Sequence, residues 1–196
     1  MPQALALALI AGYADAVGYL RFKAFAGMMT GNTVLMGMAV FGRAELSPWI
    51  YASLLALFFF AATVAFLILP RIPPAAVLAA EAVLILLADL VSAQWAAALL
   101  VLAMGLQNPV AARFGVPLNT TFITGVILRF CEGLARFLRP HPHGKAEPFM
   151  IYGLVWLGYV SGAALGTGVY GFGFAWPSLV PLVLLAGIYV PVRHIR

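Results

Sequence analysis

The chain has 196 residues, of which 64% are apolar and only 9% are charged. Soluble globular domains are roughly 45–50% apolar and about 25% charged, so the composition argues against a water-soluble enzyme. The net charge is +5, but the basic residues are scattered at segment ends and form no patch suited to nucleic acid. The composition therefore predicts an integral membrane protein whose main partner is the lipid bilayer.

Apolar runs separated by Pro, Gly or charged residues divide the chain into eight expected segments: about 3–20, 28–42, 47–69, 75–91, 94–112, 119–138, 149–170 and 177–193. The first run has no basic region before it and carries Asp15, so we expect a retained helix and not a signal peptide. We expect an all-α integral membrane bundle that forms one domain over residues 1–196.

Two of these segments, 28–42 and 119–138, differ from ordinary spans. Each follows a stretch that resists helix formation, and each contains a Thr-Gly pair at which the helix is expected to start. Thr is a favoured N-cap, so each pair predicts the N-terminus of a half-helix at membrane depth. Irregular backbone at that depth is tolerated only where protein buries it or a wet cavity borders it, and it marks binding sites in transporters.

An internal repeat is expected to relate the two halves of the chain, about 1–91 and 92–196. The positions that correspond are Gly12 and Gly105, Asp15 and Asn108, Thr30 and Thr124, and Gly31 and Gly125. If the half-helix segments re-enter without crossing, about six full spans remain and the halves are inverted. In this arrangement seven basic residues lie on the cytoplasmic side and three on the outer side. If both segments cross, there are eight spans, and the better orientation places six basic residues inside and four outside. The positive-inside rule favours the inverted arrangement, with both termini in the cytoplasm.

Four sequence blocks, in this order, resemble the YoaK family of bacterial membrane proteins: Gly12 to Ala16, Phe25 to Val34, Met104 to Asn108, and Thr120 to Gly125. The pattern spans nearly the whole chain. The resemblance implies a multi-pass protein of the bacterial inner membrane with about six or seven helices, and no established substrate, since the family carries a domain of unknown function. The half-helix pattern is also similar to that of nucleobase and sulfate permeases, as an analogy of pattern alone.

The candidate solute-binding residues are the polar and small residues at the two expected helix breaks: Asp15, Thr30, Gly31, Asn32, Gln107, Asn108, Thr124 and Gly125. An ionisable residue within an apolar helix is by default a functional candidate, which makes Asp15 the first choice. Alternatively, Asp15 lies near lipid headgroups or pairs with Arg21 or Lys23. The amides can equally hold helices together, and the Thr-Gly pairs can serve only as helix caps.

Three other groups of residues have structural interpretations. Arg129, Glu132 and Arg136 share one helix face and predict an interfacial or internally paired stripe. Glu81 and Asp89 are expected to reach the membrane interface or solvent. A stripe of small residues predicts close helix packing, either within the bundle or in a homo-oligomer, and consists of Gly158, Gly162 and Gly166.

The sequence lacks the common enzyme templates, so we expect no catalytic residue, no metal and no cofactor. The leading hypothesis is a small-solute transporter or channel whose midplane site lies between the two half-helix N-termini. An anion is one candidate solute, and Asp15 is the candidate for proton coupling. The alternative hypothesis is a non-transporting membrane scaffold or accessory subunit.

Overall fold

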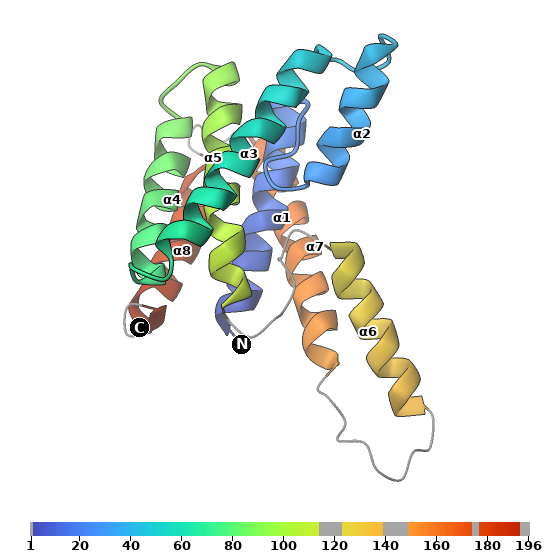
Figure 1. The fold of residues 1–196 in the computed structure, drawn as a ribbon, viewed down its shortest axis with the longest axis vertical. Coiled ribbons are helices and arrows are strands. Elements are labelled where there is room, and N and C mark those ends of the chain that lie inside the picture. Colours follow the sequence, from blue (N-terminus) through green and yellow to red (C-terminus); the bar gives the residue numbers. More distant parts are fainter. Residues whose placement is uncertain (1, 114–122, 139–148, 174–176, 193–196) are drawn as a thin grey trace.

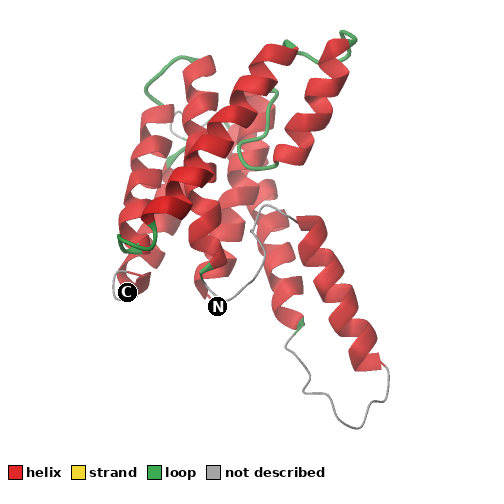
Figure 2. Ribbon diagram, viewed as in Figure 1, coloured by secondary structure: helices red, strands yellow, loops and turns green. Residues whose placement is uncertain are grey.

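The structure is a computed structural model that describes residues 2–113, 123–138, 149–173 and 177–192. These parts of the chain form eight α-helices and contain no strand (Figures 1 and 2). The helices are α1 (Pro2–Phe22), α2 (Met29–Val40), α3 (Pro48–Ile68), α4 (Pro74–Ala88), α5 (Ala93–Ala112), α6 (Ile123–Leu138), α7 (Met150–Gly171) and α8 (Leu179–Val192). The eight predicted segments are confirmed to within a few residues wherever the structure describes them.

Four helices are long and apolar enough to cross a membrane: α1, α3, α5 and α7. Each has 20 to 22 residues, which corresponds to about 30 Å of helix and so to the thickness of the hydrocarbon core. The other apolar helices α4 and α8 are shorter, with 15 and 14 residues. The chain is thus a multi-pass helical membrane protein with four candidate spans, and a total of six full spans stays a prediction.

The long helices pack in two pairs, α1 with α7 and α3 with α5, and α1 also contacts α5 (Figure 1). Helix α4 packs on α5 and α8, and α8 packs on α1. The largest apolar core lies where α1, α4, α5 and α8 meet, with buried side chains such as Ile10, Leu78, Met104 and Leu185. The two remaining helices lie outside this core, α2 against α3 and α6 against α7.

Small residues bring α1 and α7 unusually close together. The stripe of Gly158, Gly162 and Gly166 is buried against α1, and a Cβ at Gly162 would overlap the backbone carbonyl of Leu9. Gly12 of α1 is equally close to the carbonyl of Tyr159. The stripe is therefore used for packing within the chain, the first of its two predicted roles, and a homo-oligomer stays a prediction.

The two short outer helices run in opposite directions. Figure 1 shows α2 running from the middle of the molecule toward its top, whereas α6 runs from the middle toward the bottom. Their 12 and 16 residues correspond to about 18 and 24 Å, so each accompanies only part of a long neighbour. In this view the N-terminal ends of α2 and α6 lie at a similar level.

Candidate functional site

The connection between α1 and α2 turns back along α1. After Phe22 the helix ends, and Lys23 adopts a left-handed conformation with φ of 58°, which is uncommon for a residue with a side chain. Residues 24–28 then run back until the backbone of Gly27 and Met28 meets Asp15. Asp15 lies seven residues before the end of α1, so α2 begins about 10 Å short of that end.

Asp15 is buried at the point where α2 begins. Its Oδ1 accepts hydrogen bonds from the backbone N–H groups of Gly27, at 2.6 Å, and Met28, at 3.0 Å. Its Oδ2 accepts a 2.6 Å bond from the hydroxyl of Tyr159 on α7. A carboxylate is favoured beside the positive end of a helix, and charge-assisted bonds are stronger than neutral ones. Asp15 therefore joins α1, α7 and the start of α2 in one buried polar junction.

Asn32 holds the same connection from the other side. Its amide forms two bonds to the backbone of Phe25: Oδ1 accepts from the N–H at 2.9 Å, and Nδ2 donates to the carbonyl at 2.8 Å. The hydroxyl of Tyr51 on α3 donates to the carbonyl of Lys23 at 3.0 Å. Side chains thus provide partners for backbone groups that have left the helix, as buried polar groups require. The structure brings Asp15 and Asn32 together, as predicted.

The expected role of Thr30 as a helix cap is wrong. Helix α2 begins at Met29, and the N-cap residue is Met28, which makes no side-chain cap bond. Thr30 lies within the first turn and is exposed, while Gly31 is partly buried against Met28 and Phe25. Helix α2 begins before the Thr-Gly pair, so Thr30 is already helical, and the N–H of Asn32 donates to the carbonyl of Met28.

The interpretations that paired Asp15 with a neighbouring cation are also wrong. Arg21 pairs with Asp89, at 3.5 Å, and Lys23 pairs with Glu45, at 3.8 Å. Both cations point away from the junction because they belong to the last turn of α1 and to the bend after it. Asp15 itself is 2% exposed, so it does not lie in solvent.

The amides of the second half lie in the core of the bundle. Gln107 donates through Nε2 to the carbonyl of Leu7 on α1, at 2.8 Å, and thereby links α5 to α1. Asn108 is 3% exposed and donates to the carbonyl of Met104 one turn earlier. Both residues are buried, as a site or an interhelical bond would require. They belong to α5, whose contact with α1 joins the two halves of the chain.

The Thr-Gly pair of the second half lies in the first turn of α6. Thr124 is exposed and Gly125 is partly buried, whereas Val126 is fully buried against α7. Because α6 already includes Ile123, the expected role of Thr124 as its cap is wrong as well, and the segment that precedes α6, residues 114–122, lies outside the described residues. Farther along α6, Glu132 pairs with Arg129 at 3.1 Å and with Arg136 at 2.6 Å, which confirms the internally paired stripe.

A second polar cluster joins α1, α4 and the start of α8. Asp89 pairs with Arg21 and also accepts a 3.1 Å bond from the N–H of Ser178, while the hydroxyl of Tyr13 donates to the carbonyl of Pro177 at 2.6 Å. The side chain of Asp89 is only 4% exposed, so the expectation that it is solvated is wrong. A cavity of about 20 Å³ borders this cluster and has room for roughly one water molecule.

The buried positions of two polar residues were not predicted. Tyr159 lies 144 residues from Asp15 in the sequence, and nothing in its local pattern marks it as a partner. Glu81 was expected near the interface because it is close to the start of α4. It is instead fully buried, since α5 and α8 cover the middle of this short helix. A lone acid in an otherwise apolar helix was the available indication of its importance.

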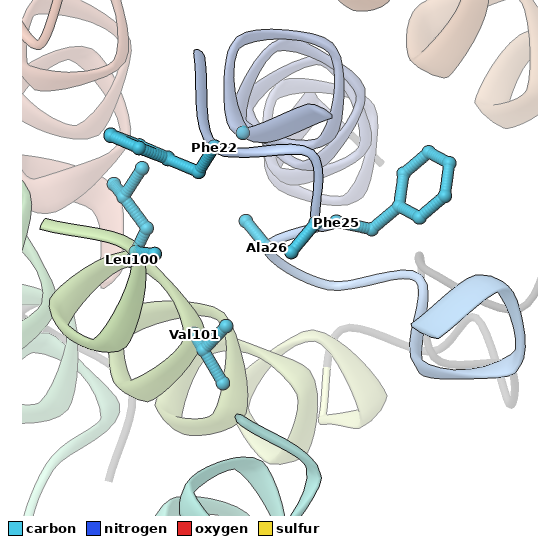
Figure 3. A pocket seen from close by; sticks show the side chains of 8 residues that line it. Phe22, Phe25, Ala26, Leu100 and Val101 are labelled. Atoms are coloured by element: carbon cyan, nitrogen blue, oxygen red, sulfur yellow. The ribbon is translucent and has the colours of Figure 1, made fainter. Parts of the chain in front are cut away.

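An apolar pocket lies on the side of the connection that faces α5 (Figure 3). Its lining includes Phe22, Ala26, Leu100 and Val101, and Figure 3 shows Ala26 opposite the part of α5 that carries Leu100 and Val101. The pocket has no room for a water molecule. It therefore records how the connection packs on α5, and the polar chemistry lies on the opposite side, at Asp15.

These features define a class: a multi-pass membrane protein with a polar helix junction buried in the bundle. Residues 3–190 match the family described as "Protein of unknown function (DUF1275)". The match covers nearly the whole chain, so the chain belongs to this family, which includes the YoaK-like proteins that the sequence blocks resemble. No curated protein and no solved structure gives a significant match.

Proposed function

We propose that this protein is a small-solute transporter or channel of the bacterial inner membrane whose site lies between the N-terminal ends of α2 and α6. The observation that carries the proposal is the start of α2 beside Asp15, about 10 Å inside the end of a membrane-spanning helix. A chain that only crosses the membrane and leaves it on the other side has no need to return to the depth at which α2 begins. Broken helices with buried ends are typical of transporter binding sites.

The hydrogen bonds of the connection support a binding role for this backbone. Peptide groups without partners cost several kcal/mol each in hydrocarbon. Asp15, Asn32 and Tyr51 together provide partners for backbone groups of residues 23–28, and this places irregular backbone at depth at a tolerable energy. The N–H groups of Thr30 and Gly31 lie in the first turn of α2, where no intrahelical acceptor exists. Such groups bind anions.

The packing of the helices supports a two-fold repeat. The repeat would match α1 with α5, α2 with α6, α3 with α7 and α4 with α8. Replacing each helix by its match turns the contact α1–α7 into the contact α5–α3, and the contact α2–α3 into the contact α6–α7. The pair α4–α5 becomes α8–α1, and the pairs α1–α5 and α4–α8 are unchanged. Each of these pairs is in contact among the described residues. This is the pattern that two related halves around one axis would produce.

The glycines proposed to correspond in the two halves have the same environment. Gly12 of α1 approaches the backbone carbonyl of Tyr159 on α7. Gly105 of α5 approaches the carbonyl of Phe58 on α3, such that an added Cβ would lie 3.0 Å from it. Helices α1 and α5, which correspond in the repeat, therefore both need a residue without a side chain at the matching position. The opposite directions of α2 and α6 in Figure 1 fit the inverted form of this repeat.

A small anion is the solute that we propose for this site. Two helix N-termini present positive ends, each worth about 0.3 to 1 kcal/mol to an anion when exposed and up to about 2 kcal/mol when partly buried. The ionised carboxylate of Asp15 beside one of them opposes a second negative charge. Loss of that charge on protonation removes the repulsion, so anion uptake is expected to strengthen as the pH falls.

Uptake into proteoliposomes tests the proposal. The purified protein is reconstituted and screened with formate, nitrate, acetate and the neutral solute uracil, against liposomes without protein. We expect faster entry of at least one small anion, and a strong reduction in Thr30→Trp, which places a bulky side chain at the exposed start of α2. Thr63→Trp is the matched control, because Thr63 is an exposed threonine of α3. Uptake equal to that of empty liposomes for every solute would contradict the proposal.

A non-transporting scaffold or accessory subunit is the second candidate, and one observation favours it. Asp15 and Asn32 already bind the chain's own backbone, so their hydrogen bonds stabilise the fold whether or not a solute enters. Under this hypothesis Asp15→Asn changes stability and no solute crosses. Under the transport hypothesis Asp15→Asn retains uptake but loses its dependence on pH.

A further inference from the structure

Glu81 is a buried acid that the proposed site does not use. It lies in the middle of α4 and is 0% exposed. Helix α4 packs on α5 and α8. The core that these helices share consists of apolar side chains, which include Leu78 and Ile85 of α4, Met104 of α5 and Leu185 of α8. The burial is produced by the protein itself and not by the surrounding lipid. Any charge on Glu81 would therefore lie in the apolar core of the bundle.

Neither carboxyl oxygen of Glu81 has a hydrogen-bond partner in the part of the chain that the structure describes. The helices that pack on α4 carry no Asp, Glu, Lys, Arg or His between their bounds, and Tyr189 of α8 is a titratable residue whose side chain lies outside the described residues. The charged groups of the nearby helix α1 are used elsewhere. Asp15 binds the start of α2, and Arg21 pairs with Asp89.

An ionised carboxylate in such a place is very unfavourable, because it has lost its hydration and gained neither a counter-ion nor a donor. A neutral carboxylic acid costs far less, and it adds an O–H donor to the group. We propose that Glu81 is a proton-binding site within the α4–α5–α8 core, which holds its proton while the bundle is closed and releases it when α4 is exposed to water.

Gln107 of α5 carries a second buried side-chain oxygen, Oε1, that lacks a partner among the described residues. Helices α4 and α5 are joined by a short connection and so run antiparallel, and Ile85 and Leu100 border the same cavity. Ile85 and Leu100 therefore lie at a similar level. One turn before Ile85 is Glu81 and one turn after Leu100 is Met104, so these two residues also lie at a similar level, and Gln107 lies about one turn farther along α5.

Infrared spectroscopy of the reconstituted protein at neutral pH tests the proton site directly. A protonated carboxyl and a carboxylate absorb in separate regions, so the difference between wild type and Glu81→Gln reports the state of this one group. We expect the wild type to show a carboxylic acid carbonyl band that Glu81→Gln lacks. Glu132→Gln, at an exposed and ion-paired position, is the matched control and retains the band.

A difference spectrum that contains carboxylate bands in place of the acid band would overturn the proposal. If Glu81→Gln does not fold, the Glu147→Gln variant with isotope-labelled glutamate, which retains Glu81, answers the same question. The other two glutamates, Glu45 and Glu132, are exposed and ion-paired, so a labelled acid band at neutral pH must come from Glu81. The absence of such a band then refutes the site.

The dependence of stability on pH gives a second readout. Because the folded protein holds this proton more tightly than the unfolded chain, stability falls with rising pH over the range in which the unfolded chain has lost the proton and the folded protein still holds it. Between about pH 6 and about pH 9, the Tm of wild type should fall by roughly 5 °C more than that of Glu81→Gln. Equal slopes would count against the site.

The proton site stands without transport, whereas its coupling to a solute rests on the proposed function. If the acid band is present but no solute crosses, the proposed function fails and the proton site remains. If a solute crosses but the acid band is absent, the proton site fails and the proposed function, in which Asp15 carries the pH dependence, remains.

Discussion

Two acids inside the bundle, Asp15 and Glu81, are equally buried but have opposite surroundings. Asp15 is 2% exposed and accepts bonds from two backbone N–H groups and one tyrosine hydroxyl. Glu81 is 0% exposed and has no partner among the described residues. Asp15 lies where the chain has left the helix, so backbone donors are available. Glu81 faces helices that already use their own N–H groups. Burial alone therefore does not assign a role to an acid in a membrane helix.

The largest effect on stability is expected from Gly162→Leu, which disrupts the packing of α7 on α1 that places Tyr159 beside Asp15. The new Cβ would overlap the carbonyl oxygen of Leu9, a backbone atom that cannot move aside, so α1 and α7 must separate. We expect a loss of at least about 3 kcal/mol, or no folded protein. Thermal unfolding in detergent measures it. Gly168→Ala is the control, because a Cβ there meets open space, and an unchanged Tm in Gly162→Leu would contradict the packing.

Asp15→Ala is expected to cost about 3 kcal/mol or more, because it leaves the N–H groups of Gly27 and Met28 and the hydroxyl of Tyr159 without their acceptor. Hydrogen exchange should show faster exchange at these two amides. Asp15→Asn should cost less, since the amide oxygen still accepts. If both variants are as stable as wild type, Asp15 does not hold the junction together.

Tyr159→Phe separates the contribution of α7 from that of the backbone donors. It removes the 2.6 Å bond to Oδ2 and leaves the two bonds to Oδ1. The expected loss is about 1.5 to 3 kcal/mol, as for a hydrogen bond to a charged group. Chemical denaturation of wild type and variant, with Tyr152→Phe as control on the same helix, provides the measurement. A loss equal to that of Asp15→Ala would mean that Tyr159 alone positions the acid.

Glu81→Leu tests the other acid, and the predicted change is small or favourable. Replacing a buried acid that has no partner among the described residues by an apolar side chain of similar size removes a cost and breaks no bond that the structure shows. We expect a change within about 1 kcal/mol, or an increase in stability. A loss as large as that of Asp15→Ala would reveal a partner for Glu81 and remove the contrast between the two acids.

Glu132→Gln should have the smallest effect. Glu132 bridges Arg129 and Arg136, but all three side chains are exposed on α6. Exposed ion pairs contribute about 0 to 1 kcal/mol, so the Tm should change by only a degree or two. A larger change would indicate that this face of α6 is covered in the membrane.

The sequence by itself determined the elements. Apolar runs and their Pro, Gly and charged breaks are local properties, and they predicted the eight helices and the membrane class, because helix formation and transfer into lipid depend on neighbouring residues. The same patterns selected Asp15, Asn32 and Gln107, each of which is buried and bonded in the structure.

Only the tertiary structure decided what each polar residue binds. The partner of Asp15 on α7 and the burial of Asp89 and Glu81 depend on how helices distant in the sequence are rotated and spaced. Contacts such as the approach of Gly162 to Leu9 set that spacing. A hydrophobic pattern reports that a residue lies in a helix, but the face that the helix turns to its neighbours follows from packing in three dimensions.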